Sequence, residues 1–236
     1  MALGPQDLTV ISNLISQATA GGGANLVQQD FGPLFSQYKI TYGTALEFIA
    51  DSLYDTQTYP PAGATILTFF QTQFTLGNLA LTNMPLAGML PDRQGFLVMS
   101  IRTFFVAHPT VMAPVAAPAV QVTASNDLLN LISNGVLALN FLNKDYGKFP
   151  AWLLPAGGGV YSSLATAGIA APGAVIDTAN NGYPDARNIY VLEQPLFLPP
   201  MTKLGVTANF GPTPPVVQVA TPIKVLFDGL MVRPIQ

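Results

Sequence analysis

The chain has 236 residues; half of them are hydrophobic, only 9% are charged, and the formal net charge is −3. An ordinary domain carries roughly 25% charged residues, and disorder needs low hydrophobicity with high net charge, so this composition excludes a disordered chain. The balance is slightly acidic, which disfavours sequence-specific nucleic-acid binding. The absence of cysteine excludes disulfides, thiolate catalysis and cysteine-ligated metals.

The first predicted element is a short helix in an N-terminal arm, residues 1–25. Apolar residues recur there at three- and four-residue spacing, and the glycines at 21–23 end the pattern and form a linker. The apolar positions are Leu8, Ile11, Leu14, Ile15 and Ala18. The alternative is a terminal helix packed on the main domain. No basic region precedes an apolar stretch, so we predict no secretory signal.

A second helix is predicted near residues 44–54. Thr44 followed by Glu47 fits a capping box, in which each side chain satisfies a free backbone N–H group at the helix start. Leu46, Phe48, Ile49 and Leu53 then supply an apolar face. The prolines at 60–61 close the segment, because proline is excluded from a helix interior.

From residue 64 onward the pattern changes to a period of two, which predicts strands. Leu204, Val206 and Ala208 share one parity, while Lys203 and Thr207 share the other, as in a half-buried strand. The predicted strands span residues 64–73, 74–81, 95–107, 115–123, 135–141, 188–198, 202–210 and 223–228. The segment 95–107 is apolar on both parities, which indicates a strand covered on both faces.

Glycine, proline and asparagine separate these strands. Residues 143–147 are read as a turn, and residues 154–187 as a long loop or insertion. Asp228-Gly229 is the favoured dipeptide of a two-residue hairpin turn, and the alternative is a continuous strand with a bulge at Gly229. Many short strands with such turns favour one all-β sandwich or barrel domain over residues 26–236.

A charge-poor chain must be tested for membrane spans. The uncharged run 149–176 contains Pro150, Pro155 and Pro172, and the segment 104–125 is interrupted by prolines in the same way. A spanning helix needs about 20 consecutive, predominantly apolar residues. We therefore predict no transmembrane helix.

Groups for nucleophilic catalysis are scarce. His108 is the only histidine and precedes a proline, so a surface histidine is favoured over a catalytic base. A Ser/His/Asp triad would need His108, and Ser162 lacks the Gly-x-Ser-x-Gly sequence of a nucleophile elbow. The glycines at 157–159 lack the Lys-Ser/Thr that follows a phosphate-binding loop, which favours a hinge.

The carboxylates form two groups that could serve a glycosidase, which needs two of them facing each other. One group is Asp177, Asp185 and Glu193; the other is Glu47, Asp51 and Asp55 on one face of the predicted helix, where a solvated stripe is the simpler interpretation. Asp177 with Asp185 is also a candidate for a hard cation, although no EF-hand spacing is present. We assign no catalytic, cofactor or metal site.

The combined pattern resembles a known family. It joins an N-terminal arm, a charge-poor β-sandwich with long Ala/Gly/Pro loops, the segment 181–200 leading into a strand, and the terminal strand 223–236. In these features the chain resembles viral jelly-roll coat proteins, in style the small major capsid proteins of tailless icosahedral bacteriophages. The resemblance concerns residues 60–236 and rests on architecture, so it carries over no binding residue.

The resemblance implies a jelly roll of eight strands in two sheets. A single roll with insertions is favoured over a compact double roll, which would leave under about 15 residues for each strand and its loop. It also implies a virion protein that assembles with copies of itself, as trimers or pseudo-hexameric capsomers, and with other coat proteins. A lipid layer beneath the shell would be a further partner, reached by the N-terminal arm.

The low charge agrees with this expectation, because interfaces between permanently associated subunits are more apolar than ordinary surface. The expected function is therefore a structural, non-enzymatic coat subunit. Two alternatives remain open at this stage. One is a carbohydrate-binding or carbohydrate-cleaving β-sandwich, on a spike or secreted, and the other is a fimbrial or surface-layer subunit.

Overall fold

The computed structural model describes residues 46–112, 124–141, 144–154, 161–166, 175–182 and 190–234. The predicted N-terminal helix, its glycine linker and the predicted strand 115–123 lie outside the described residues. Within them the chain is mostly β, as expected.

Strands dominate the order of elements along the chain, with one α-helix among the described residues. The elements are β1 (Leu46–Tyr59), β2 (Ile66–Phe69), β3 (Gly95–Met112), α3 (Ala124–Asn134), β4 (Val136–Phe141), β5 (Lys144–Pro150), the 3-10 turn η1 (Ala151–Leu153), β6 (Tyr161–Thr166), β7 (Val175–Asn180), β8 (Tyr190–Leu198), β9 (Leu204–Asn209) and β10 (Thr221–Pro234).

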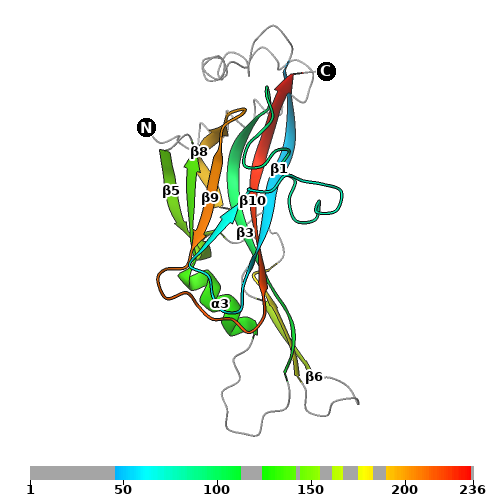
Figure 1. Ribbon diagram of the computed structural model, residues 1–236, viewed down its shortest axis with the longest axis vertical. Coiled ribbons are helices and arrows are strands. Elements are labelled where there is room, and N and C mark those ends of the chain that lie inside the picture. The colour runs from blue at the N-terminus through cyan, green and yellow to red at the C-terminus, as the bar shows by residue number, and fades with distance from the viewer. Residues whose placement is uncertain are drawn as a thin grey trace.

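Two antiparallel sheets pack face to face, which confirms the predicted β-sandwich (Figure 1). One sheet has the strand order β8-β3-β10-β1 and the other β2-β9-β4-β5. The C-terminal part of β3 continues beyond the first sheet and pairs with β7 of the β6–β7 hairpin. Figure 1 shows this hairpin extending past the end of the sandwich that α3 covers.

The core lies between the sheets and follows from the period-two pattern. In β9, Leu204, Val206 and Ala208 are buried, and in β10 the residues Ile223 and Val225 are buried in the same alternation. Two aromatic contacts join distant segments: Tyr59 meets the edge of Phe210, and Phe70 stacks on Phe227 with ring centroids 5.2 Å apart. Each fully buried large apolar side chain contributes roughly 1.5–3 kcal/mol.

Helix α3 closes one end of the sandwich and was not predicted. Leu128 and Leu131 are fully buried, while Leu129 faces outward. The helix ends at Gly135, whose N–H donates to the carbonyl of Leu131 at 2.9 Å. A Cβ at this position would approach that carbonyl oxygen to 2.9 Å, so only glycine fits. The spacing of Leu128, Leu131 and Ile132 before a glycine was a helix signal in the sequence.

The predicted helix near residues 44–54 is wrong, because residues 46–59 form strand β1. This strand pairs with β10 over its whole length, from Leu46 opposite Pro234 to Tyr59 opposite Thr221. The apolar residues after Thr44 lie on both parities, so the local pattern does not show the strand. The long pairing with β10 outweighs the local capping signal. Thr44 itself lies outside the described residues.

Four further expectations about the strands and turns need correction. Residues 74–81 form turns rather than a strand. Asp228-Gly229 is not a hairpin turn: β10 runs straight through as the continuous-strand alternative expected, but the extra residue at the register shift is Met99 of β3 and not Gly229. Residues 144–147, predicted as a turn, belong to β5, and the predicted loop 154–187 contains the β6–β7 hairpin.

The other strand predictions hold with shifted ends. Those for residues 95–107, 135–141, 188–198 and 202–210 correspond to β3, β4, β8 and β9, and β2 occupies the centre of 64–73. Among the described residues, none of the helices is both long enough and apolar enough to cross a membrane.

Candidate functional site

The structure does not bring the candidate carboxylates of β1 together. Glu47, Asp51 and Asp55 share one face of a strand instead of a helix, where a four-residue step spans about 13 Å. The two carboxyl groups of a glycosidase lie about 5–9.5 Å apart. Asp51 is exposed and Asp55 is buried, so these side chains also lie in different environments.

The second group of carboxylates is also dispersed. Asp177 lies in β7 and Glu193 lies exposed in β8, which pair with different parts of β3. Asp185 and the glycines at 157–159 lie outside the described residues. His108 falls in β3 and Ser162 in β6, but their side chains, like that of Asp177, are outside the described part of the structure. Among the described residues there is no group of three metal-ligating side chains.

Asp55 has a structural task. It is only 1% exposed, and its Oδ2 accepts hydrogen bonds from the backbone N–H of Phe70 at 2.7 Å and from Nε2 of Gln57 at 3.0 Å. Phe70 has a left-handed backbone, with φ of 61°, which is strained for a bulky residue. The carboxylate therefore stabilises an unfavourable backbone at the point where the chain leaves β2.

A polar cluster occupies the outer face of the first sheet, beside the bulge at Met99 of β3, opposite Asp228 and Gly229 of β10. The Asp228 carboxylate accepts two hydrogen bonds from Arg102, from Nε to Oδ2 and from Nη2 to Oδ1, both at 2.6 Å. The hydroxyls of Ser52 and Ser100 donate to the same carboxylate at 2.7 and 3.1 Å. We call these four residues the bulge cluster.

The electrostatics of the bulge cluster favour a charged aspartate. Burial raises the pKa of the Asp228 carboxyl, but the hydrogen bonds from Arg102, Ser52 and Ser100 and the Arg102 charge outweigh it. The pKa of Asp228 therefore lies below its ordinary value of 3.8. With both carboxylate oxygens doubly hydrogen-bonded, the cluster is a structural clamp across three strands rather than a general acid or base.

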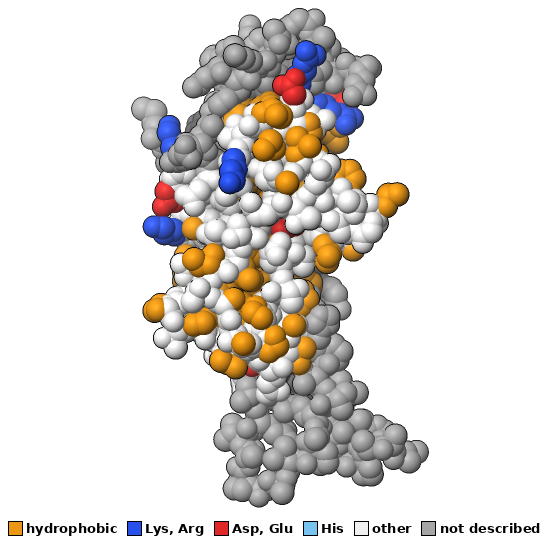
Figure 2. Space-filling model, viewed as in Figure 1, with side chains coloured by type: hydrophobic (Ala, Val, Ile, Leu, Met, Phe, Trp, Pro, Cys, Tyr) orange, Lys and Arg blue, Asp and Glu red, His pale blue; other side chains and the backbone are white. Residues whose placement is uncertain are grey.

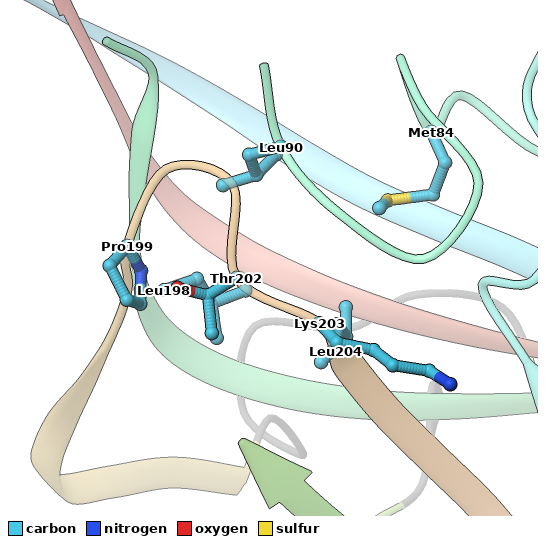
Figure 3. Close-up of a pocket in the computed structure, with 7 residues that line it drawn as sticks. All are labelled: Met84, Leu90, Leu198, Pro199, Thr202, Lys203 and Leu204. Carbon is cyan, nitrogen blue, oxygen red and sulfur yellow. The ribbon is translucent and has the colours of Figure 1, made fainter. Parts of the chain in front are cut away.

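A small pocket lies beside the turn between β8 and β9 (Figure 3). Its cavity volume is about 10 Å³, which is room for roughly one water molecule and far below the roughly 300–1,000 Å³ of ligand sites. Its lining is mostly apolar: Met84, Leu90, Leu198, Pro199, Thr202, Lys203 and Leu204. Figure 3 shows the ammonium group of Lys203, its one charged group, directed away from the other side chains. This lining offers no acid–base pair for chemistry.

The more unusual feature is apolar surface. The loop of residues 71–83, between β2 and β3, displays the side chains of Phe74, Leu76, Leu79 and Leu81, and Leu76 is 95% exposed. Figure 1 shows this teal loop at the right of the sandwich, beside β1. No charged residue occurs between Asp55 and Asp92, so the loop and its surroundings in sequence carry no charge.

The loop is held in place by a dense set of hydrogen bonds. The N–H of Phe74 donates to the carbonyl of Met84 at 2.8 Å and closes its base, and Asn78 bonds to Gln73 and Thr75 inside it. Asn83 pairs with the free edge of β1, donating its N–H to the Tyr54 carbonyl and accepting the Tyr54 N–H at Oδ1. Its shape is therefore set before any partner arrives.

Two side chains of the first sheet also donate hydrogen bonds to the loop backbone. The Tyr54 hydroxyl donates to the Leu79 carbonyl at 2.6 Å. Lys224 lies over the Tyr54 ring, and its Nζ donates to the Ala80 carbonyl at 3.0 Å. The polar groups near the loop thus bind its backbone, and its apolar side chains are left to face outward.

A second apolar surface lies at the α3 end of the sandwich, and we call it the α3-end surface. It displays Ile66, Leu129, Trp152 and Val216, of which Val216 is 71% and Trp152 61% exposed. Hydrogen bonds join the segments that carry them: Phe210 to Thr65, Gln218 to Asp127 of α3, and Ala151 to Gly135. Figure 2 shows orange side chains gathered over the lower part of the described surface, with the blue and red ones mainly higher.

Both apolar surfaces were missed by the residue-level sequence analysis, which placed a strand over most of the loop. The signal that could have found the loop is the turn-forming Gly77-Asn78 pair within a long uncharged segment. No family model matches the chain, and a search of curated proteins gives no match for it.

Proposed function

We propose that this chain is a coat subunit: a structural, non-enzymatic protein that assembles with copies of itself into the icosahedral shell of a virion, built as one jelly roll with insertions. The order in which the strands pair supports the jelly-roll part of the proposal. The observation that carries the coat function is the exposed apolar surface of the described residues.

The strands of the sandwich pair as four nested sets. The first strand, β1, pairs with the last, β10; β2 pairs with β9, β3 with β8, and β4 with β5. All of these pairs are antiparallel. A long hairpin rolled into two sheets gives this nesting, which is the pairing expected of a jelly roll. The β6–β7 hairpin is then an insertion between the fifth and sixth strands of the roll.

Jelly rolls serve as viral capsid domains, lectins and cupins, so the fold alone does not select a function. The surface favours a capsid. Cupins and lectins hold ligands through polar or metal-ligating groups, whereas the described residues display a small apolar pocket and two exposed apolar surfaces. Contiguous exposed apolar patches mark interaction sites.

The charged residues point the same way. Among the described residues, eight charged side chains pair with each other within the subunit. The pairs are Arg102–Asp228, Arg233–Glu47, Lys148–Asp145 and Arg93–Asp92. With 9% charge in all, little remains to solvate the apolar surface. A subunit whose surface is covered by neighbours tolerates this, because subunit interfaces are depleted in charge.

The test is the size and shape of what the purified full chain forms. We expect closed particles of one size class in negative-stain micrographs and a single fast-sedimenting species in analytical ultracentrifugation. A monodisperse monomer at every measurable concentration contradicts the proposal. Filaments or flat sheets contradict the closed shell and favour a fimbrial or surface-layer subunit instead.

A further inference from the structure

We propose that the 71–83 loop of one subunit packs on the α3-end surface of the next copy of this chain. The inference rests on the proposed function, because it assigns the contact by which the shell would be assembled. It concerns two surfaces of one molecule that differ in shape and have the same apolar character.

The loop has the properties of a rigid inserting element. Its backbone is bound by Asn78 from within and by Tyr54 and Lys224 from the sheet, and Asn83 at its end donates its side-chain amide to the Ser52 carbonyl of β1. At its base, the strained Phe70 is held by buried Asp55. A loop ordered in this way loses little further conformational entropy on binding, which favours affinity. Its apolar side chains are nevertheless left uncovered by the subunit itself, and Leu76 is 95% exposed.

The chemistry of the loop selects an uncharged partner surface. With no charged residue between Asp55 and Asp92, the loop has no charge of its own to attract an ion or a charged peptide. The one cation described beside it, Lys224, is engaged by the Ala80 carbonyl and the Tyr54 ring. The α3-end surface matches it, because no charged residue occurs between Lys203 and Lys224, the segment that supplies Val216. Trp152 adds an exposed aromatic side chain, the residue type most enriched among energetically dominant interface positions.

The small exposed area of the loop argues for a contact that is repeated between copies of this chain, rather than for one isolated contact with another protein. Its four large apolar side chains expose about 400 Å² together. One partner of a standard interface contributes roughly 800 Å², so a lone contact of this size would be weak. In a head-to-tail arrangement each subunit uses its loop once and its α3-end surface once. Heterologous contacts close into a ring where the rotation between neighbouring subunits closes, and every subunit of such a ring is held twice.

Two features of the chain make the test direct. It contains one tryptophan, Trp152, so its tryptophan fluorescence, excited selectively over the eight tyrosines, reports on the α3-end surface alone. That side chain is 61% exposed in the free subunit. We expect the Trp152 emission to shift to the blue when subunits of the full chain associate, because packing against the loop removes the indole from water.

The first variant is Leu76→Ser, with Val191→Ser as its matched control. Val191 is an exposed apolar residue of β8 outside both surfaces. Leu76→Ser should raise the concentration needed for half-assembly about tenfold or more and move the Trp152 shift to the same higher concentration. Val191→Ser should leave both unchanged. Far-UV circular dichroism and the urea midpoint show that each variant is folded.

The second experiment uses the absence of native cysteine. A mixture of the Leu76→Cys variant and the Val216→Cys variant should form disulfide-linked dimers on mild oxidation. The pair Leu76→Cys with Lys148→Cys, in which Lys148 lies on exposed β5, should not.

Each outcome decides between the two proposals. If the wild-type chain assembles but Leu76→Ser assembles equally well, or Leu76→Ser and Val191→Ser weaken assembly alike, the loop contact is overturned and the coat function stands. If Leu76→Ser weakens assembly while the Trp152 emission of the wild-type chain does not shift on association, the loop does not bind the α3-end surface and the inference is overturned. If the wild-type chain stays monomeric, both proposals are overturned.

Discussion

The bulge cluster and the 71–83 loop lie near the same sheet, but they differ in what they expose. The cluster pairs its charged groups within the subunit, whereas the loop exposes apolar side chains. In the bulge cluster, a carboxylate partly removed from water receives hydrogen bonds from Arg102, Ser52 and Ser100, so its charge is fully used inside the subunit. In the loop, the polar backbone groups are bonded, while Leu76 and its apolar neighbours face outward.

These two regions show where this protein places its few charges. Charged side chains stabilise strand pairing, as when Arg233 pairs with Glu47 directly across β1 and β10. They are not used to make the loop or the α3-end surface soluble. Mutations in the first region should therefore change the free energy of unfolding, and mutations in the second should change association.

The largest effect on stability is expected opposite the bulge, from Gly229→Ala. A Cβ on Gly229 would overlap the backbone carbonyl of Leu97 on β3, which cannot move without parting the two strands. We expect a loss of about 3 kcal/mol or more in the free energy of unfolding, measured by urea denaturation. The control is Gly77→Ala in the loop, where the nearest atom, Thr75 Oγ1, lies 3.9 Å away. Equal effects of the two changes would refute this account of the bulge.

Arg102→Met should have the next largest effect. It leaves the Asp228 carboxylate, whose side chain is 23% exposed, without its charged partner. Breaking a buried pair costs about 3–5 kcal/mol, and partial exposure reduces this to about 2 kcal/mol. The matched control is Arg93→Met, since the Arg93–Asp92 pair is largely exposed and should contribute under about 0.5 kcal/mol. A loss no greater than that of the control would show that the cluster contributes little.

The pH dependence of unfolding should report the same cluster. Because the pKa of Asp228 is lower in the folded chain than its ordinary 3.8, the folded state holds this proton less tightly than the unfolded state. Its contribution is present in full above pH 3.8 and is lost as the pH falls through the lower folded value. Denaturation of Asp228→Asn should show a shallower decline in this range than wild type and Asp92→Asn. Identical acid profiles for all three proteins would contradict the pKa shift.

The smallest effect on folding should come from Leu76→Ser. Because the Leu76 side chain is 95% exposed, its replacement should change the free energy of unfolding by no more than about 0.5 kcal/mol. The same variant should carry the largest defect in association. A marked loss of stability in the urea midpoint would instead mean that the loop packs on its own subunit and that the two regions do not differ in role.

Strands were predictable where apolar and polar residues alternate regularly along the chain. The alternation in β9 and β10 marks Val206 and Val225 as core residues without any tertiary information. The helix predicted for residues 44–54 was wrong because the capping signal at Thr44 and Glu47 is local, whereas the pairing with β10 extends over fourteen residues of β1. The strand predicted for residues 74–81 was wrong for a related reason. An apolar run with turn residues can form either a strand or an exposed loop, and only its neighbours in the folded chain decide which.

The candidate site was predictable only as a property of the whole chain. The low charge indicated a covered surface, but not where that surface lies. The candidate carboxylates Glu47, Asp51 and Asp55 were grouped by a helical spacing that the strand removes. Asp55 turned out to be a buried anchor for Phe70, a role that no spacing in the sequence indicates.

The local sequence pattern was sufficient for the all-β class, for the alternation that buries one face of each strand, and for the scarcity of charge. Which strands pair, and where the surplus apolar side chains lie, became known only from the folded chain. The physical reason is the range of the interactions. Burial alternates with every residue and can be read locally, whereas Ser52 meets Asp228 across 176 positions of the chain. Pairings of that kind set the nesting of the strands, and the nesting sets which apolar side chains remain on the surface.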